Sequence, residues 1–227
     1  IKLPRKLKRS TLPSYDRAIS KWAIVKVNED GTHTLVSHAR YADDVIAKYS
    51  AEKCEFKGKK GIAAGGGSKY IADFDSLDVH SITQNIVLNT IISTTRGGGF
   101  TQPYYYGGRT YYINTGSVAG YDATLKAAQK KDIVVEAIIL TPTGSGYTDP
   151  ECTGGYYTMP NMTTALATNY YAASLDYLAR RYSTGENGRI HHWIMHNEVD
   201  QGDTWTNMGS QPEMRFYDRY IKSMRLC

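Results

Sequence analysis

The chain is poor in cysteine and contains no long hydrophobic run. Its three cysteines, Cys54, Cys152 and Cys227, have no metal-ligand spacing, and their odd number argues against a complete disulfide framework. No apolar segment approaches the roughly 18 residues that a membrane span needs, and no signal peptide is visible at the first residues. The sequence therefore predicts no metal site, no cofactor and no membrane span.

Zinc-finger spacing and other nucleic-acid motifs are also missing. The formal net charge of +5 is concentrated at the start of the chain, on Lys2, Arg5, Lys6, Lys8 and Arg9, and the remainder is close to balanced. A short basic tail is more often a solvated extension than a phosphate-binding element, so we expect no nucleic-acid partner. With 41% hydrophobic and 22% charged residues among 227, the chain has the composition of a globular protein with a sizeable core.

Tyrosine is the aromatic residue that the chain has in excess, with 19 copies, several of them adjacent in the sequence. These clusters lie at 104–106, 111–112, 156–157 and 170–171. An aromatic ring with a polar tip suits the face of a sugar, but packing inside loops produces such clusters at least as often. Both interpretations stay open at this point.

Residues 1–57 form a predicted N-terminal unit that consists of the basic tail, a β-hairpin and a short helix. Two β-rich runs at 21–27 and 32–36 flank a Gly-containing turn at 28–31, which is typical of a hairpin. The helix is expected at 43–49. Such a unit could cap the bottom of a barrel or be the remnant of an accessory sheet.

Residues 58–227 alternate between predicted strands and helices, which is the order of a parallel α/β sheet. Strands are expected at 61–64, 80–89, 133–140 and 190–197, and helices at 121–128 (after Asn114 or Ser117), 165–181 and 213–221. The glycines at 65–67 are interpreted as a flexible loop, because no Lys-Ser/Thr pair follows to complete a phosphate site. Two long loops, 93–115 with a small hairpin at 104–112, and 141–164, should lie at the C-terminal ends of the strands.

Polar residues at the strand ends form the candidate site. The last predicted strand stops on Asn197 and Glu198, and the strand at 80–89 stops on Asn89. If odd-numbered residues face the barrel axis, Asn85 lies on the same side as Asn89. In a parallel sheet that is covered on both faces, such polar groups collect at the C-terminal mouth.

Glu136 interrupts the apolar run at 133–140, and a buried carboxylate must find a partner or stay protonated. His192 and His196 stand at alternate positions of the neighbouring strand, so a contact between Glu136 and one of them is plausible. A structural polar pair and a catalytic pair are about equally good explanations.

The Asn197-Glu198 pair on the fourth predicted strand resembles the clan A-type retaining glycoside hydrolases with a (β/α)8 barrel, in which an Asn-Glu pair ends strand four. Residues 80–209 also resemble a bacterial family of uncharacterised glycosidase-like barrel domains. The similarity rests on the segments 85–89, 146–150, 193–199 and 205–209. It implies an α/β fold of TIM-barrel type, with the N-terminal half, about four β/α units, present in residues 58–227.

The resemblance implies a double displacement by two carboxyl groups about 5 to 5.5 Å apart, acting on a poly- or oligosaccharide. Glu198 matches the general acid/base, and Asn197 would bind the 2-hydroxyl of the sugar. His196 stands where the wider pattern often has a small residue, so it would narrow the sugar subsite or tune Glu198. Further residues expected to contact the sugar are Asn85, Asn89, Tyr156 and Trp205.

The nucleophile is expected beyond residue 227, because the clan places it on strand seven. A half barrel would expose two strand edges and an apolar interior, so we expect completion by further sequence, a second chain or self-association. Two other functions stay open: a catalytically inactive carbohydrate-binding protein, and a structural or assembly protein built on the half barrel. We expect an extracellular or cell-surface location.

Overall fold

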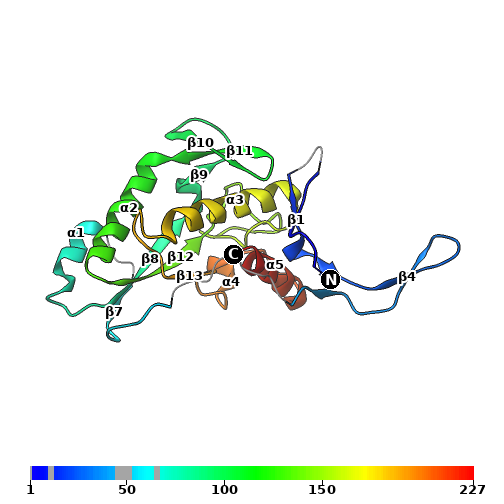
Figure 1. The fold of residues 1–227 in the computed structure, drawn as a ribbon, viewed down its shortest axis with the longest axis horizontal. Helices are drawn as coiled ribbons and strands as arrows, with labels where there is room; N and C mark the ends of the chain where they lie inside the picture. The colour runs from blue at the N-terminus through cyan, green and yellow to red at the C-terminus, as the bar shows by residue number, and fades with distance from the viewer. Residues whose placement is uncertain (1, 10–12, 44–52, 64–66) are drawn as a thin grey trace.

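The computed structural model describes residues 2–9, 13–43, 53–63 and 67–227. Of the predicted helix at 43–49 only Asp43 falls among them, and of the glycine loop at 65–67 only Gly67, so the rest of both predictions lies outside the described residues. The described chain combines a central sheet with surrounding helices, and an N-terminal hairpin projects from one end (Figure 1).

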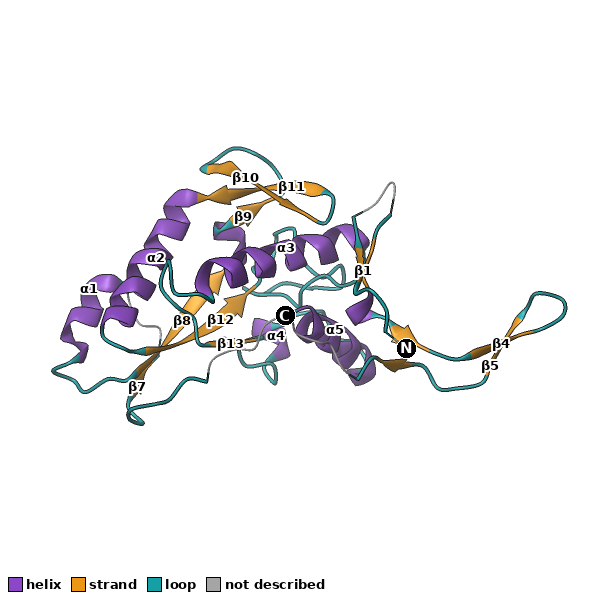
Figure 2. Cartoon of the chain, in the orientation of Figure 1, coloured by secondary structure: helices purple, strands orange, loops and turns teal. Residues whose placement is uncertain are grey.

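Four parallel strands form the central sheet, in the order β13-β12-β8-β7 (Figure 2). They are β7 (Gly61–Ile62), β8 (Ser81–Val87), β12 (Val134–Leu140) and β13 (His192–Ile194). Each overlaps a predicted strand, but β7 and β13 are shorter than predicted. Because the strands are parallel, the segments 93–115 and 141–164 and Glu198 follow strands at the same edge of the sheet. Among the described residues the sheet is open, with β7 and β13 at its edges.

One face of this sheet is buried and the other is open. Ile82, Ile86 and Ile139 are at most 1% exposed, and Ile86 stands opposite Ile139. On the other face, Val134 and Leu140 at the two ends of β12 are buried. The positions between and beside them are half-buried or exposed; they are Thr83, Asn85, Glu136, Ile138, His192 and Ile194. The expectation of a buried Glu136 is therefore corrected: Glu136 lies opposite His192 on the open face.

Helices α2 (Thr115–Lys130) and α3 (Ala165–Tyr182) contribute to one hydrophobic core with the buried face of the sheet. Asn114 caps α2, because its Oδ1 accepts a hydrogen bond from the N–H of Gly116 at 3.1 Å. The remaining helices are α1 (Ser68–Ile71), α4 (Gly202–Trp205), α5 (Glu213–Leu226) and the short 3-10 turns Arg17–Ile19, Ala72–Phe74 and Leu88–Thr90. None of the helices in the described ranges has the length and apolar character needed to cross a membrane.

The segment after β8 forms a small antiparallel sheet of β9 (Ile92–Ser93), β10 (Phe100–Tyr106) and β11 (Arg109–Asn114). The predicted hairpin at 104–112 is confirmed. Its turn residues Gly107 and Gly108 have φ angles of 57° and 87°, which a two-residue hairpin turn of this kind requires. Tyr111 of β11 stacks on Tyr170 of α3 with ring centres 5.5 Å apart, so part of the tyrosine excess serves loop packing.

The N-terminal strands pair in three short ribbons: β1 (Lys6–Leu7) with β2 (Tyr15–Asp16), β3 (Lys21–Trp22) with β6 (Arg40–Tyr41), and β4 (Val25–Val27) with β5 (His33–Leu35). The last pair confirms the predicted hairpin. Two of these ribbons reach α5, because Tyr41 donates to Asp218 at 3.0 Å and Arg5 donates to the backbone oxygen of Leu226 at 3.4 Å. Part of the N-terminal unit is thus packed against the last helix.

The two faces of β12 can be tested with neighbouring residues. We expect Ile139→Ala to lower the free energy of unfolding by about 2 to 5 kcal/mol, because it leaves a cavity in the core. Ile138→Ala, on the open face, should cost about 1 kcal/mol or less. Urea unfolding of both variants measures the difference, and equal or reversed costs would contradict the assignment of the faces.

Candidate functional site

Glu198 stands four residues after the end of β13, at the C-terminal edge of the sheet. Its side chain is exposed, and its backbone has a φ angle of 37°, in the left-handed region that a glutamate rarely adopts. The backbone N–H of Gln201 donates to the backbone carbonyl oxygen of Glu198 at 2.8 Å and closes a turn that leads into α4. Residues with strained backbone of this kind are often found at functional sites, so the conformation makes Glu198 a candidate functional residue.

The carboxylate of Glu198 is oriented by an indole. Trp205, the last residue of α4, donates a hydrogen bond from Nε1 to Oε2 of Glu198 at 2.9 Å. Hydrogen bonds to an ionised acceptor are among the stronger ones in proteins. One carboxylate oxygen is therefore held in place.

Trp205 is fixed in turn by an aromatic neighbour from the long loop at 141–164. The ring of Tyr157 stacks on the indole with centres 5.1 Å apart and an interplanar angle of 9°. The backbone supports this contact, because the N–H of Tyr157 donates to the oxygen of Thr204 at 3.3 Å. Tyr156, the preceding residue, is 81% exposed. Of the predicted residues, Trp205 is thus brought next to Glu198, while Tyr156 precedes the residue that stacks on it.

His196 lies in the core and not at the mouth. It is 5% exposed, and its Nε2 contacts the hydroxyl of Ser223 in α5 at 3.2 Å. Its Nδ1 contacts the backbone oxygen of Ile139 at 3.4 Å. Burial lowers the pKa of His196 to about 4, so the ring is neutral at physiological pH. This histidine ties the end of β13 to β12 and α5 and does not face a ligand.

The remaining predicted residues are spread along the same edge. Asn197 is half-buried beside Glu198. Asn85 is exposed on the open face of β8, opposite Ile138 of β12. Because β12 lies between β8 and β13, those two strands are about 10 Å apart. Asn89 is exposed in the turn after β8. Asn89 thus follows β8 at the C-terminal edge and Asn85 lies within the strand, and neither contacts Glu198 among the interactions of the described residues.

Sequence reasoning overlooked Tyr157 as the residue that orients Trp205. The adjacent pair at 156–157 was the available signal, since neighbouring residues of an extended segment point to opposite sides. It also overlooked Asn207, whose Oδ1 accepts from the N–H of Thr153 at 3.0 Å and whose Nδ2 donates to the oxygen of Asp203 at 2.9 Å. Nothing in the sequence pattern reports such a contact between distant segments. Across the described ranges, no group of three or more His, Cys, Asp or Glu side chains is arranged to hold a metal ion.

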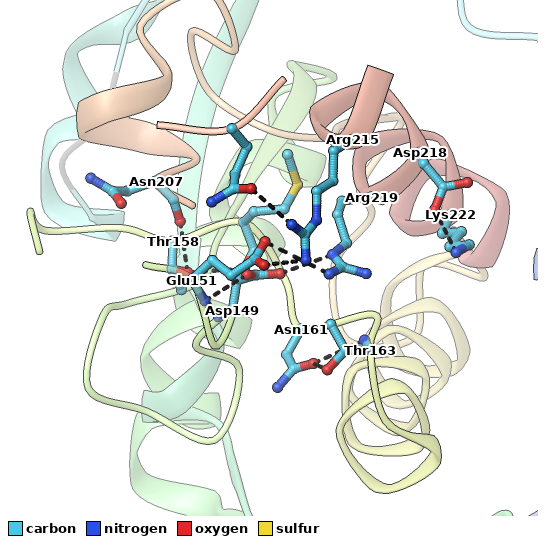
Figure 3. Close-up of polar contacts among 12 residues, drawn as sticks. Asp149, Glu151, Thr158, Asn161, Thr163, Asn207, Arg215, Asp218, Arg219 and Lys222 are labelled. Carbon is cyan, nitrogen blue, oxygen red and sulfur yellow. Dashed lines mark hydrogen bonds and ion pairs between the residues drawn. The ribbon is translucent and has the colours of Figure 1, made fainter. Parts of the chain in front are cut away.

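A charged network connects the loop at 141–164 with α5, and Figure 3 shows Asp149 and Glu151 facing Arg215 and Arg219. Arg219 approaches the fully buried Asp149 at 3.3 Å, and Arg215 pairs with Glu151. Burial raises the pKa of the Asp149 carboxyl, and the N–H of Glu151 and the charge of Arg219 offset this only in part. The network holds the segment that carries Tyr157 against the last helix.

Arg219→Ala should lower the free energy of unfolding by about 3 to 5 kcal/mol, because it leaves the buried Asp149 without its counter-charge. The matched control is Arg180→Ala, which breaks the exposed pair with Asp176 and should cost about 1 kcal/mol or less. Chemical denaturation of the two variants measures both values. An equally small loss for Arg219→Ala would show that the network does not stabilise the fold.

Comparison with known proteins gives one family. Residues 52–227 match a family model that is described as a family of unknown function (DUF5722). Neither the search of curated proteins nor that of solved structures finds a match.

Proposed function

The chain belongs to the DUF5722 family, and we propose that it is a retaining glycoside hydrolase that acts on an oligo- or polysaccharide with Glu198 as its general acid/base. The observation that carries the proposal is the contact of the Glu198 carboxylate with the indole of Trp205, which stacks on Tyr157 at the C-terminal edge of a parallel sheet. Active sites of α/β barrels occupy this edge.

The surroundings of Glu198 suit a sugar. Rings with a polar tip offer an apolar face to the C–H groups of a pyranose and a hydrogen-bonding group to its hydroxyls. Tyr156, which precedes Tyr157 in the chain, is exposed, and the half-buried Asn197 directly precedes Glu198. Binding sites for small organic ligands typically combine aromatic walls with a small number of polar groups.

Glu198 would act twice in the reaction. In the first step its carboxyl group donates a proton to the leaving oxygen as the glycosidic bond breaks, and in the second it removes a proton from the attacking water. Because Trp205 donates to Oε2, the proton would be carried by Oε1. Asn197 would bind the 2-hydroxyl of the sugar, where a hydrogen bond strengthens in the transition state.

A retaining enzyme also needs a carboxylate nucleophile about 5 to 5.5 Å from the acid/base. Among the residues that directly follow the four strands, at 63, 88–90, 141–143 and 195–198, Glu198 is the one carboxylate. We assign the nucleophile to the polypeptide that completes the half barrel. Two features support such a completion: the open sheet face that carries Ile138 and Ile194, and an apolar stripe on α5 formed by Met214, Tyr217, Ile221 and Met224, which are 41 to 75% exposed.

If the half barrel is completed, the stripe on α5 is covered in the full-length protein. Met224→Cys, in a background with the three native cysteines changed to serine, should then react with a thiol reagent many times more slowly than Tyr105→Cys, whose site on the β10–β11 hairpin is 73% exposed. Mass spectrometry follows the labelling under native conditions. Equal labelling rates would show that the stripe faces solvent and that no completing polypeptide covers it.

A carbohydrate-binding role without turnover is the second candidate. It is favoured by the same observation that Glu198 is the one carboxylate at the ends of the described strands. In that case Tyr156, Trp205 and Asn197 would still contact sugar, but no glycosidic bond would be cleaved. Either activity suits a protein at the cell surface or outside the cell, where polysaccharides are exposed.

Glu198→Gln should reduce hydrolysis of natural glycosides about 100-fold or more, because the amide cannot donate the proton to the leaving oxygen. Substrates with a good leaving group need no such proton, so the first step should be spared for them. Trp205→Phe, which keeps an aromatic ring but loses the indole N–H, should show a smaller loss. Release of reducing sugar measures both, with Glu29→Gln in the turn between β4 and β5 as control. Unchanged hydrolysis by Glu198→Gln would refute the assignment.

A further inference from the structure

A cavity of about 250 Å³ lies between α4, the segment that follows it and the first turn of α5. Sites for drug-sized ligands usually measure about 300 to 1,000 Å³, so the cavity suits one small unit. Its lining residues are Asp200, Gln201, Gly202, Asp203, Thr206, Met208, Gly209 and Phe216. Trp205, which orients Glu198, belongs to the same short helix.

The polar groups of this lining are acceptors for a cation. Asp200 and Asp203 are carboxylates with exposed side chains, and Gln201 adds an amide oxygen. No basic side chain lines the cavity. The ring of Phe216 supplies an apolar wall whose π face also attracts a cation. The lining therefore favours a small ligand that carries both positive charge and C–H groups, and it disfavours an anion.

Thr206 provides an independent sign of a ligand. The residue is fully buried, and its Oγ1 has no hydrogen-bond partner among the described residues. Buried hydroxyl groups are almost always paired, because the loss of hydration is otherwise uncompensated. A Cβ atom built on Gly202 would lie 3.8 Å from this Oγ1 and 3.5 Å from Cε2 of Phe216. The unpaired hydroxyl and the aromatic ring thus border the same space, and Gly202 leaves it open.

We propose that this cavity is a subsite for an amino sugar with a free ammonium group. The ammonium has three donors, which Asp200, Asp203 and the Thr206 hydroxyl can accept, and the pyranose C–H groups pack against Phe216. Among the described residues, no group of three or more His, Cys, Asp or Glu side chains is arranged to hold a metal ion. The subsite deepens the proposed function by naming the substrate class: a glycan that contains hexosamine units.

The inference rests on the proposed function for the glycan, but it can be tested by binding alone. The probes are four methyl glycosides of one ring, those of glucosamine, N-acetylglucosamine, glucose and glucuronic acid. Titration into ¹⁵N-labelled protein should shift the amide signals of Gly202 and Thr206 with the glucosaminide. We expect the glucosaminide to bind about tenfold more tightly than the neutral rings, and the glucuronide to bind least.

Four variants locate the effect. Gly202→Ala places a methyl group in the cavity at ordinary contact distances and should reduce affinity about tenfold without strain. Thr206→Val should also weaken binding. Asp200→Asn and Asp203→Asn should each lower the affinity for the glucosaminide about threefold. The double variant should lose both the preference for the amine and the salt dependence of binding. The control is Asp73→Asn near α1, which should change nothing.

Equal affinity for the charged and neutral rings, or shifts that avoid Gly202 and Thr206, would overturn the subsite. The two proposals fail separately when the titration is combined with a hydrolysis assay of the same unmodified protein. Binding of the glucosaminide by a protein that cleaves no glycoside keeps the subsite and discards the hydrolase. Cleavage of glycosides with no preference for the amine keeps the hydrolase and discards the subsite.

Discussion

The parallel pairing of β12 with both β8 and β13 is the constraint on which the rest of the structure depends. It places the C-terminal ends of the strands at one edge, so the long loops and Glu198 are brought there without any contact between them being needed. It also gives the sheet two unlike faces, one buried in the core and one that carries the exposed Asn85 and the half-buried Glu136 and Ile138. The candidate site lies at this edge.

Local patterns predicted the elements that make up this arrangement. The apolar run before Leu140, the cap at Asn114, which was one of two candidates beside Ser117, and the glycine turn of the β10–β11 hairpin each define a structure through contacts within a few residues. The exposure of Glu136 was not predictable in the same way, because strand periodicity separates two faces but does not say which of them other elements cover. The burial of His196 depends on Ser223, 27 residues further along the chain.

For the candidate site, the sequence predicted the position of a carboxylate after a strand but not the contacts that position it. Glu198 ends an apolar strand, and that is visible in the sequence. Its partner Trp205, the stacking of Tyr157 and the bonds of Asn207 join three segments whose order in the chain gives no register. The short helix α4 connects the two proposals, because its last residue, Trp205, holds Glu198, and its first two residues, Gly202 and Asp203, line the cavity.

The central claim is that Glu198 supplies and removes protons during glycoside cleavage, and chemical rescue tests it most directly. In Glu198→Ala, a substrate with a good leaving group should still form the covalent intermediate, which water without a general base attacks slowly. Azide needs no base, so its addition should restore turnover and yield a glycosyl azide of retained configuration. Turnover of the variant that is as fast as that of the unmodified protein and indifferent to azide would contradict the account.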